Sequence, residues 1–246
     1  MVIVMVSEFY EEQIRVAKTQ HTIVMIATTL SIFVWFFLAI NFMFGCWLYV
    51  TLNPSNVMTI LNRLKSYFYV AGILFIIHGI IQTATPAVIY LTRRWSGISS
   101  FLLLVITLLF IVALILCIYG GIMIIKKLPE LEAGCREAFD VYSVDPDRAK
   151  SLLREVKGNY SRGALKYVQI GLWIYFVGYV MAMWGIVDFR GARNVCIGFL
   201  LIGIGHLLLL MLVPVFNMIP IIGYILWFLG SGDIEKTVIE KYGEAI

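Results

Sequence analysis

The chain has 246 residues, of which 61% are hydrophobic and 14% are charged, and its formal net charge is +4. Soluble domains carry about 25% charged residues, so this composition excludes an ordinary soluble protein. The small positive charge is spread over separate segments, and it provides no concentrated basic surface of the kind that binds nucleic acid.

The charged residues are segregated along the chain. Five tracts contain no Asp, Glu, Lys or Arg, namely residues 19–62, 66–92, 95–125, 167–187 and 194–232. A membrane-spanning helix needs roughly 20 mostly apolar residues, and each tract is long enough to hold one. We therefore predict an all-α protein of the cell membrane, a bundle of five or six transmembrane helices in the lipid bilayer.

Residues 1–21 are predicted to form a short amphipathic helix on the membrane surface. Ser7 can cap this helix, and the acidic residues that follow it suit the positive end of the helix dipole. Neither a basic region nor a sufficiently long apolar stretch precedes Ser7, so we expect no cleavable signal peptide.

Residues 22–125 are predicted to hold the first three spans. The expected boundaries are about 22–50, 67–91 and 99–125, with tyrosine and tryptophan near several ends as interfacial anchors. The turn-forming sequence NPSN at 53–56 separates the first two spans.

The segment 126–165 has the composition of a soluble protein. Asp145 can cap a helix that has Pro146 at its first position and Gly158 just past its end. Apolar stripes on both sides of this cap predict an αα-hairpin whose two helices pack together. The hairpin is either a structural connector or a docking surface for a protein partner. Its many Lys and Arg residues predict a cytoplasmic location.

Residues 166–230 are predicted to hold the remaining two or three spans, followed by a polar C-terminal tail over 231–246. As one helix, the uncharged tract 194–232 would be about 58 Å long, whereas the hydrocarbon core is about 30 Å thick. The prolines and asparagine in VPVFNMIP, at 213–220, therefore predict a reversal or break there. We expect a short sixth span or a re-entrant half-helix, and we favour six spans.

Polar side chains are rare inside the predicted spans. Each is a candidate for function, because a polar group in hydrocarbon is costly unless it is satisfied. His78 and His206 fall near the middle of the second and fifth spans. Gln82 and Thr85 follow His78 at i+4 and i+7, so the three share one helix face that must point into the bundle. The candidates for lining a substrate cavity are Asn41, Gln82, Thr85 and Asn217.

Three interpretations of the two histidines stay open. They are neutral imidazoles that hold helices together, or ligands of one haem between His78 and His206, or part of a cavity for a neutral solute. A metal ion is disfavoured, because the usual third and fourth ligands are missing.

A shared spacing also suggests an internal repeat. Pro86 follows His78 by eight residues, and Pro214 follows His206 by the same interval. Two halves of three spans each would have opposite orientations, which is the inverted-repeat architecture of many transporters.

No sequence motif indicates an enzyme. The chain lacks the signatures of phosphate-binding loops, zinc proteases and serine hydrolases, and its four cysteines form no CxxC pair. The sequence favours a non-enzymatic membrane subunit or partner-binding scaffold that acts through the 126–165 hairpin. An electron-transfer cytochrome and a small carrier for a neutral solute are the alternatives.

Overall fold

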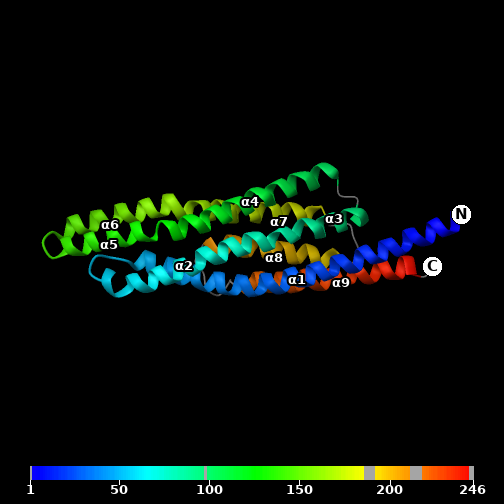
Figure 1. The fold of residues 1–246 in the computed structure, drawn as a ribbon, viewed down its shortest axis with the longest axis horizontal. Helices are drawn as coiled ribbons and strands as arrows, with labels where there is room; N and C mark the ends of the chain where they lie inside the picture. Colours follow the sequence, from blue (N-terminus) through cyan, green and yellow to red (C-terminus); the bar gives the residue numbers. More distant parts are fainter. Residues whose placement is uncertain (1, 97–98, 186–191, 211–217, 244–246) are drawn as a thin grey trace.

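The computed structural model describes residues 2–96, 99–185, 192–210 and 218–243. Within these residues the regular elements are helices, and Figure 1 shows them assembled into one elongated bundle. The helices are α1 (Val2–Thr51), α2 (Val57–Ile81), α3 (Thr85–Ser96), α4 (Ser100–Lys126), α5 (Leu128–Tyr142), α6 (Pro146–Tyr160), α7 (Lys166–Trp184), α8 (Ala192–Leu210) and α9 (Ile219–Gly243).

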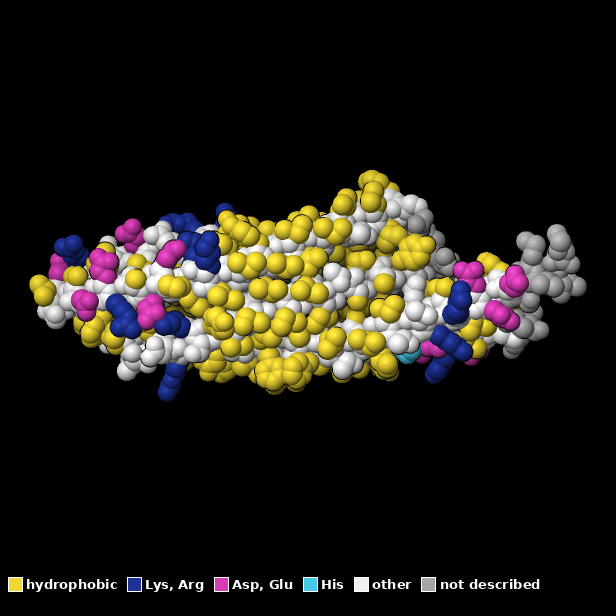
Figure 2. Space-filling view, viewed as in Figure 1, with side chains coloured by type: hydrophobic (Ala, Val, Ile, Leu, Met, Phe, Trp, Pro, Cys, Tyr) yellow, Lys and Arg dark blue, Asp and Glu magenta, His cyan; other side chains and the backbone are white. Residues whose placement is uncertain are grey.

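Among the described residues, five helical stretches are long and apolar enough to cross a membrane. They are Glu8–Thr51, Val57–Leu91, Ser100–Lys126, Pro146–Trp184 and Ala192–Leu209. Figure 2 shows apolar side chains in a broad band around the middle of the molecule, with charged side chains at both ends. The prediction of an all-α, multi-pass membrane bundle is confirmed.

Six of the described helices form a closed ring. α1 packs on α2, α2 on α4, α4 on α7, α7 on α8, α8 on α9, and α9 back on α1. Figure 1 places the N-terminal part of α1 and the C-terminal part of α9 at the same end of the bundle. α9 is the sixth helix of the ring but is not among the five stretches that are apolar enough to cross a membrane. Its uncharged part, 219–232, is about 21 Å long. Most of the predicted break at 213–220 lies outside the described residues.

Two glycine pairs bring neighbouring helices into backbone contact. A Cβ atom on Gly121 of α4 would lie 2.5 Å from the carbonyl oxygen of Gly72 of α2. A Cβ atom on Gly198 of α8 would lie 2.7 Å from the carbonyl oxygen of Gly223 of α9. Small residues of this kind allow close helix packing in a membrane. The ring can be divided into two halves, α1–α2–α4 and α7–α8–α9. In each half, the second helix therefore meets the third at a glycine pair.

α1 is one helix of 50 residues, where the sequence predicted a separate surface helix over 1–21. Proline and glycine are absent from 2–44, so nothing interrupts the helix before the span. Figures 1 and 2 show that its N-terminal part continues along the bundle and projects beyond the apolar band. The predicted helix is present, but it extends from the span instead of lying across the end of the bundle.

The segment predicted as a polar tail, 231–246, is helical as far as Gly243. This part of α9 packs beside the N-terminal part of α1, and the ring centroids of Tyr10 and Tyr242 lie 5.2 Å apart. The two helices thus form a paired extension at the end of the molecule that carries both termini (Figure 1).

The second pass contains one irregular turn. Residues Gln82–Ala84 form a 3-10 turn, η1, between α2 and α3. Pro86 has no N–H to donate to the Gln82 carbonyl, and the N–H of Thr85 binds that carbonyl instead. The proline therefore tightens the helix beside two of the predicted site residues without ending the pass.

α5 and α6 form the predicted hairpin at the other end of the bundle (Figure 1). Asp145 caps α6, because its carboxylate accepts a hydrogen bond from the N–H of Arg148 at 3.0 Å. Pro146 occupies the first turn, as the sequence predicts. Gly134 of α5 leaves room for Val156 of α6, since a Cβ on this glycine would lie 2.3 Å from the valine side chain.

α6 does not end at Gly158, as the sequence predicted, but continues to Tyr160. A π-helical turn, η2 (Ser161–Leu165), then joins it to α7. Tyr160 is buried, and its hydroxyl donates to the carbonyl of Ile124 in α4 at 3.0 Å. This contact with a distant helix stabilises the helical path past the glycine.

An ion-pair cluster fastens the hairpin to the ring. Lys65 of α2 donates to the carboxylate of Glu132 of α5, and Arg136 donates to the same carboxylate at 2.9 Å. The hydrogen bond from Lys65, followed by that from Arg136, lowers the pKa of the Glu132 carboxyl below its ordinary value. The hairpin is therefore held at a defined position relative to α2.

Candidate functional site

The two intramembrane histidines meet inside the ring. His78 comes from α2 and His206 from α8, and both side chains are fully buried. Their Nε2 atoms lie 3.0 Å apart, which is the separation of an N–H···N hydrogen bond. Residues 128 positions apart in the chain are thus direct partners.

The neighbours of the pair define which nitrogen carries each proton. His206 Nδ1 lies 2.7 Å from the carbonyl oxygen of Ile202. A carbonyl only accepts, so Nδ1 is the donor and Nε2 of the neutral His206 ring is an acceptor. The Nε2–H of His78 therefore donates to His206. This leaves Nδ1 of His78 as a buried acceptor without a hydrogen-bond partner among the described residues.

Aromatic rings from other helices enclose the histidine pair. The ring of Trp35, in α1, lies 5.5 Å from His78 and 4.9 Å from His206, measured between centroids. Tyr175, in α7, lies 5.9 Å from His78 and 5.3 Å from His206. Tyr179 stacks on His206 at 5.6 Å. The pair is covered by α1 and α7 as well as by its own two helices.

A second polar cluster lies around Gln82. Its side-chain nitrogen donates to the hydroxyl of Tyr224 at 2.8 Å, and its side-chain oxygen accepts from the hydroxyl of Tyr179. Thr85 Oγ1 lies 3.3 Å from the same Tyr179 hydroxyl. Gln82 is 2% exposed and the other three are fully buried. These side chains from three separate parts of the ring satisfy one another's hydrogen bonds, as buried polar groups in proteins generally do.

Sequence spacing placed three of these residues correctly. His78, Gln82 and Thr85 are all buried inside the ring. Asn41 does not join them, because it is partly exposed and its amide donates to the carbonyl of Phe37 in its own helix at 2.8 Å. Asn217 lies outside the described residues, so its predicted place in a cavity is untested.

The aromatic members of the site were missed by the sequence analysis. The sequence analysis singles out none of the four, which are Trp35, Tyr175, Tyr179 and Tyr224. The spacing of Tyr175 and Tyr179 at i and i+4 in the middle of a span is the signal that indicates an inward-facing pair. Tyrosine at a membrane boundary has water available to its hydroxyl, whereas a mid-span tyrosine can find a partner only inside the protein, as Tyr179 does in Gln82.

The haem considered as one alternative for His78 and His206 does not fit this arrangement. A bis-histidine haem holds its iron between two nitrogens about 4 Å apart, with the porphyrin between the imidazole rings. Here the two Nε2 atoms bond directly to each other at 3.0 Å. Among the described residues, no group of three or more His, Cys, Asp or Glu side chains could hold a metal ion.

A third histidine connects α1 and α9 near the ends of the chain. His21 Nδ1 lies 2.8 Å from Ser231 Oγ, and its Nε2 lies 3.8 Å from a carboxylate oxygen of Glu235. The residue types are those of a hydrolase triad, but the Ser231 hydroxyl donates to the Phe228 carbonyl at 2.7 Å. Its proton is therefore directed away from His21, which is the reverse of nucleophile activation.

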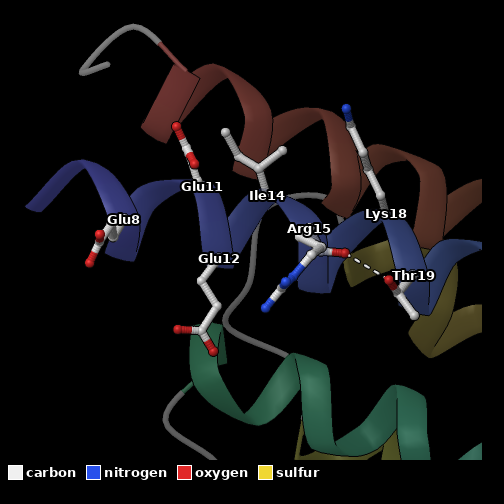
Figure 3. A pocket seen from close by; sticks show the side chains of 7 residues that line it. All are labelled: Glu8, Glu11, Glu12, Ile14, Arg15, Lys18 and Thr19. Carbon is white, nitrogen blue, oxygen red and sulfur yellow. Dashed lines mark hydrogen bonds between the residues drawn. The ribbon is translucent and has the colours of Figure 1, made fainter. Parts of the chain in front are cut away.

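A shallow recess runs along the projecting part of α1. Its lining residues all belong to this helix, and they are Glu8, Glu11, Glu12, Ile14, Arg15, Lys18 and Thr19. Figure 3 shows these side chains spreading to different sides of the helix, and the marked hydrogen bond joins Thr19 only to the backbone of Arg15. The charged groups do not converge on a common point, so the recess does not form a binding site.

Comparisons with protein-family models, with curated proteins and with solved structures each found no match. The class of the protein rests on its own fold, an all-α helical bundle of the membrane with a buried polar centre.

Proposed function

We propose that this protein is a non-enzymatic membrane scaffold that presents the α5–α6 hairpin to a protein partner on the cytoplasmic side. The observation that carries the proposal is the closed centre of the ring. His78, His206 and Gln82 are at most 2% exposed and hydrogen bond to other buried side chains. Such a centre stabilises the bundle, and the surfaces available to other molecules lie at its two ends.

The structure of the hairpin supports the same proposal. Its two helices are joined to α4 and α7 with little or no interruption, and Lys65 and Glu132 fasten it to α2. Apolar side chains are nevertheless exposed toward its tip, where Phe139 is 39% and Val144 is 86% exposed. A surface that is rigid, charged and locally apolar is suited to binding a partner protein, because little ordering is needed on association.

A photo-crosslinking experiment in native membranes tests the proposal. A photoreactive amino acid at Val144 is expected to yield discrete protein adducts. The same residue at Phe101, which is 76% exposed and lies in a helix of the apolar band, is the matched control. Phe101 should yield lipid adducts and no discrete protein band. An absence of protein adducts at Val144, or identical bands at both positions, would contradict the scaffold function.

A carrier for a small neutral solute is the second candidate. The two halves of the ring, α1–α2–α4 and α7–α8–α9, have the same order of neighbours, which is compatible with the predicted inverted repeat. The buried acceptor His78 Nδ1 and the buried hydroxyl of Tyr175 both lack partners among the described residues. A solute with a donor and an acceptor could bind them, provided that the centre opens to water during transport.

A further inference from the structure

A recess lies where the end of α1 meets α6, at the hairpin end of the bundle. Its volume is about 230 Å³. Its lining combines three cationic side chains with apolar ones, and the residues are Leu52, Asn53, Pro54, Lys150, Leu153, Arg154 and Lys157. None of these described lining residues is acidic.

The cations come from one face of α6. Lys150, Arg154 and Lys157 stand at i, i+4 and i+7, which places them one above another on a helix. Lys150 Nζ forms an ion pair with the Asp147 carboxylate at 3.2 Å, and both side chains are mostly exposed. Arg154 has no ion pair or side-chain hydrogen bond among the described residues, so its guanidinium is available to a ligand.

Lys157 holds the two sides of the recess together. Its Nζ donates to the carbonyls of Val50 and Leu52, at 3.2 and 3.4 Å, and lies 5.2 Å from the centre of the Tyr49 ring. The carbonyls at a helix end have no partners within the helix, and Lys157 supplies one. The recess therefore keeps its shape and a fixed positive charge without a ligand.

The other wall of the recess is the loop that follows α1, and this loop is also ordered. The side-chain oxygen of Asn53 accepts hydrogen bonds from the N–H groups of Ser55 and Asn56, both at 3.1 Å. Leu52 and Pro54 are buried beneath it. A ligand meets a pre-formed surface, which reduces the entropy lost on binding.

The recess lies at the edge of the apolar band. Trp47 of α1, which is 59% exposed, precedes it by about one helical turn, as an interfacial anchor does. Figure 2 shows that Lys and Arg side chains begin where the apolar band ends on this side of the molecule. Anionic lipid headgroups occupy this level of a membrane, and cationic side chains near it bind them.

We propose that this recess binds a phosphate group, supplied by an anionic membrane lipid. Arg154 binds two phosphate oxygens through its planar guanidinium. Lys150 and Lys157 contribute point charges on the same side. This site is separate from any partner surface at the hairpin tip.

Native mass spectrometry of the full chain in detergent tests the site with phosphatidylglycerol as the probe and phosphatidylcholine as the neutral comparison. Arg154→Gln removes the free cation of the recess. Arg148→Gln is the matched control, because it removes an exposed arginine of α6 that does not line the recess. Each cation near an anionic headgroup contributes about a fivefold factor, so Arg154→Gln should weaken phosphatidylglycerol binding at least fivefold and Arg148→Gln should not.

A competition with inorganic phosphate distinguishes the two sources of the phosphate group. Failure of millimolar phosphate to displace phosphatidylglycerol supports a lipid site. If phosphate displaces phosphatidylglycerol and Arg154→Gln abolishes this displacement, the result supports the phosphate chemistry and assigns the site to soluble phosphate. Equal losses in the two variants, no loss in either, or equal binding of phosphatidylcholine would overturn the proposal.

Discussion

The centre of the bundle and its hairpin end both contain polar side chains, but they use them differently. At the centre, His78 and His206 hydrogen bond to each other. Gln82 donates to Tyr224, and all of these side chains are closed to solvent. At the hairpin end, Arg154 and Lys150 face outward around a recess. A polar group in hydrocarbon must be satisfied inside the protein, whereas a group near water can be left for a ligand. This difference is the basis of both proposals, in which the centre stabilises the fold and the hairpin end binds other molecules.

The largest expected effect comes from the close contact between α8 and α9. In Gly198→Ala the new Cβ would lie 2.7 Å from the Gly223 carbonyl oxygen and 2.8 Å from the Trp227 nitrogen, so the helices must separate. We expect a loss of about 1–3 kcal/mol in the free energy of unfolding, measured by denaturation in detergent micelles.

Gly158→Ala is the matched substitution at the hairpin end. Its Cβ would meet only the guanidinium of Arg162, at 3.7 Å, and alanine is the better helix former by about 0.5–1 kcal/mol. We expect unchanged or increased stability. Equal destabilisation by the two substitutions would show that helix packing is no tighter between α8 and α9 than at the hairpin end.

A pair of tyrosine substitutions tests the hydrogen bonds of the centre. Tyr179→Phe removes the donor to Gln82 and leaves the amide oxygen unpaired, which should cost about 1 kcal/mol. Tyr175→Phe removes a hydroxyl that has no partner among the described residues, so stability should change by no more than about 0.5 kcal/mol. A reversed order in the denaturation midpoints would contradict the assignment of the cluster.

The smallest effect concerns pH and the hairpin. Because Lys65 lowers the pKa of Glu132, the pair stabilises the protein at pH values above the ordinary carboxyl pKa. This contribution is lost as the pH falls through the lowered pKa of Glu132. Both side chains are partly exposed, at 32% and 23%, so the contribution should be about 1 kcal/mol or less. Thermal unfolding of wild type and Glu132→Gln should differ at neutral pH and converge in acid. A difference independent of pH would exclude the ion pair as its cause.

Hydropathy predicted the membrane fold well, because the absence of charge over 20 or more residues is a local property of the chain. The cap at Asp145 was predicted from an equally local signal, a capping residue followed directly by proline. Two boundaries were wrong because a helix continued past a local signal. α1 has no residue that ends it before the span, and α6 passes Gly158 because Tyr160 binds Ile124 of another helix.

The partners in the site could be predicted only in part. The spacing of His78, Gln82 and Thr85 indicates a shared face, but not the side chains that meet it. Tyr179 and Tyr224 lie 97 and 142 positions away from Gln82. Their contacts depend on how the six helices close into a ring, which a single sequence does not encode in any local pattern.

The central claim is that the polar centre stays closed in the membrane, and modification of histidine by diethylpyrocarbonate tests it most directly. The unmutated protein contains its own control, because the His21 side chain is 23% exposed while His78 and His206 are fully buried. In lipid vesicles at neutral pH, peptide mass spectrometry should find His21 modified and the other two intact until the protein is denatured. Modification of His78 or His206 at the rate of His21 would contradict the closed centre and favour the carrier.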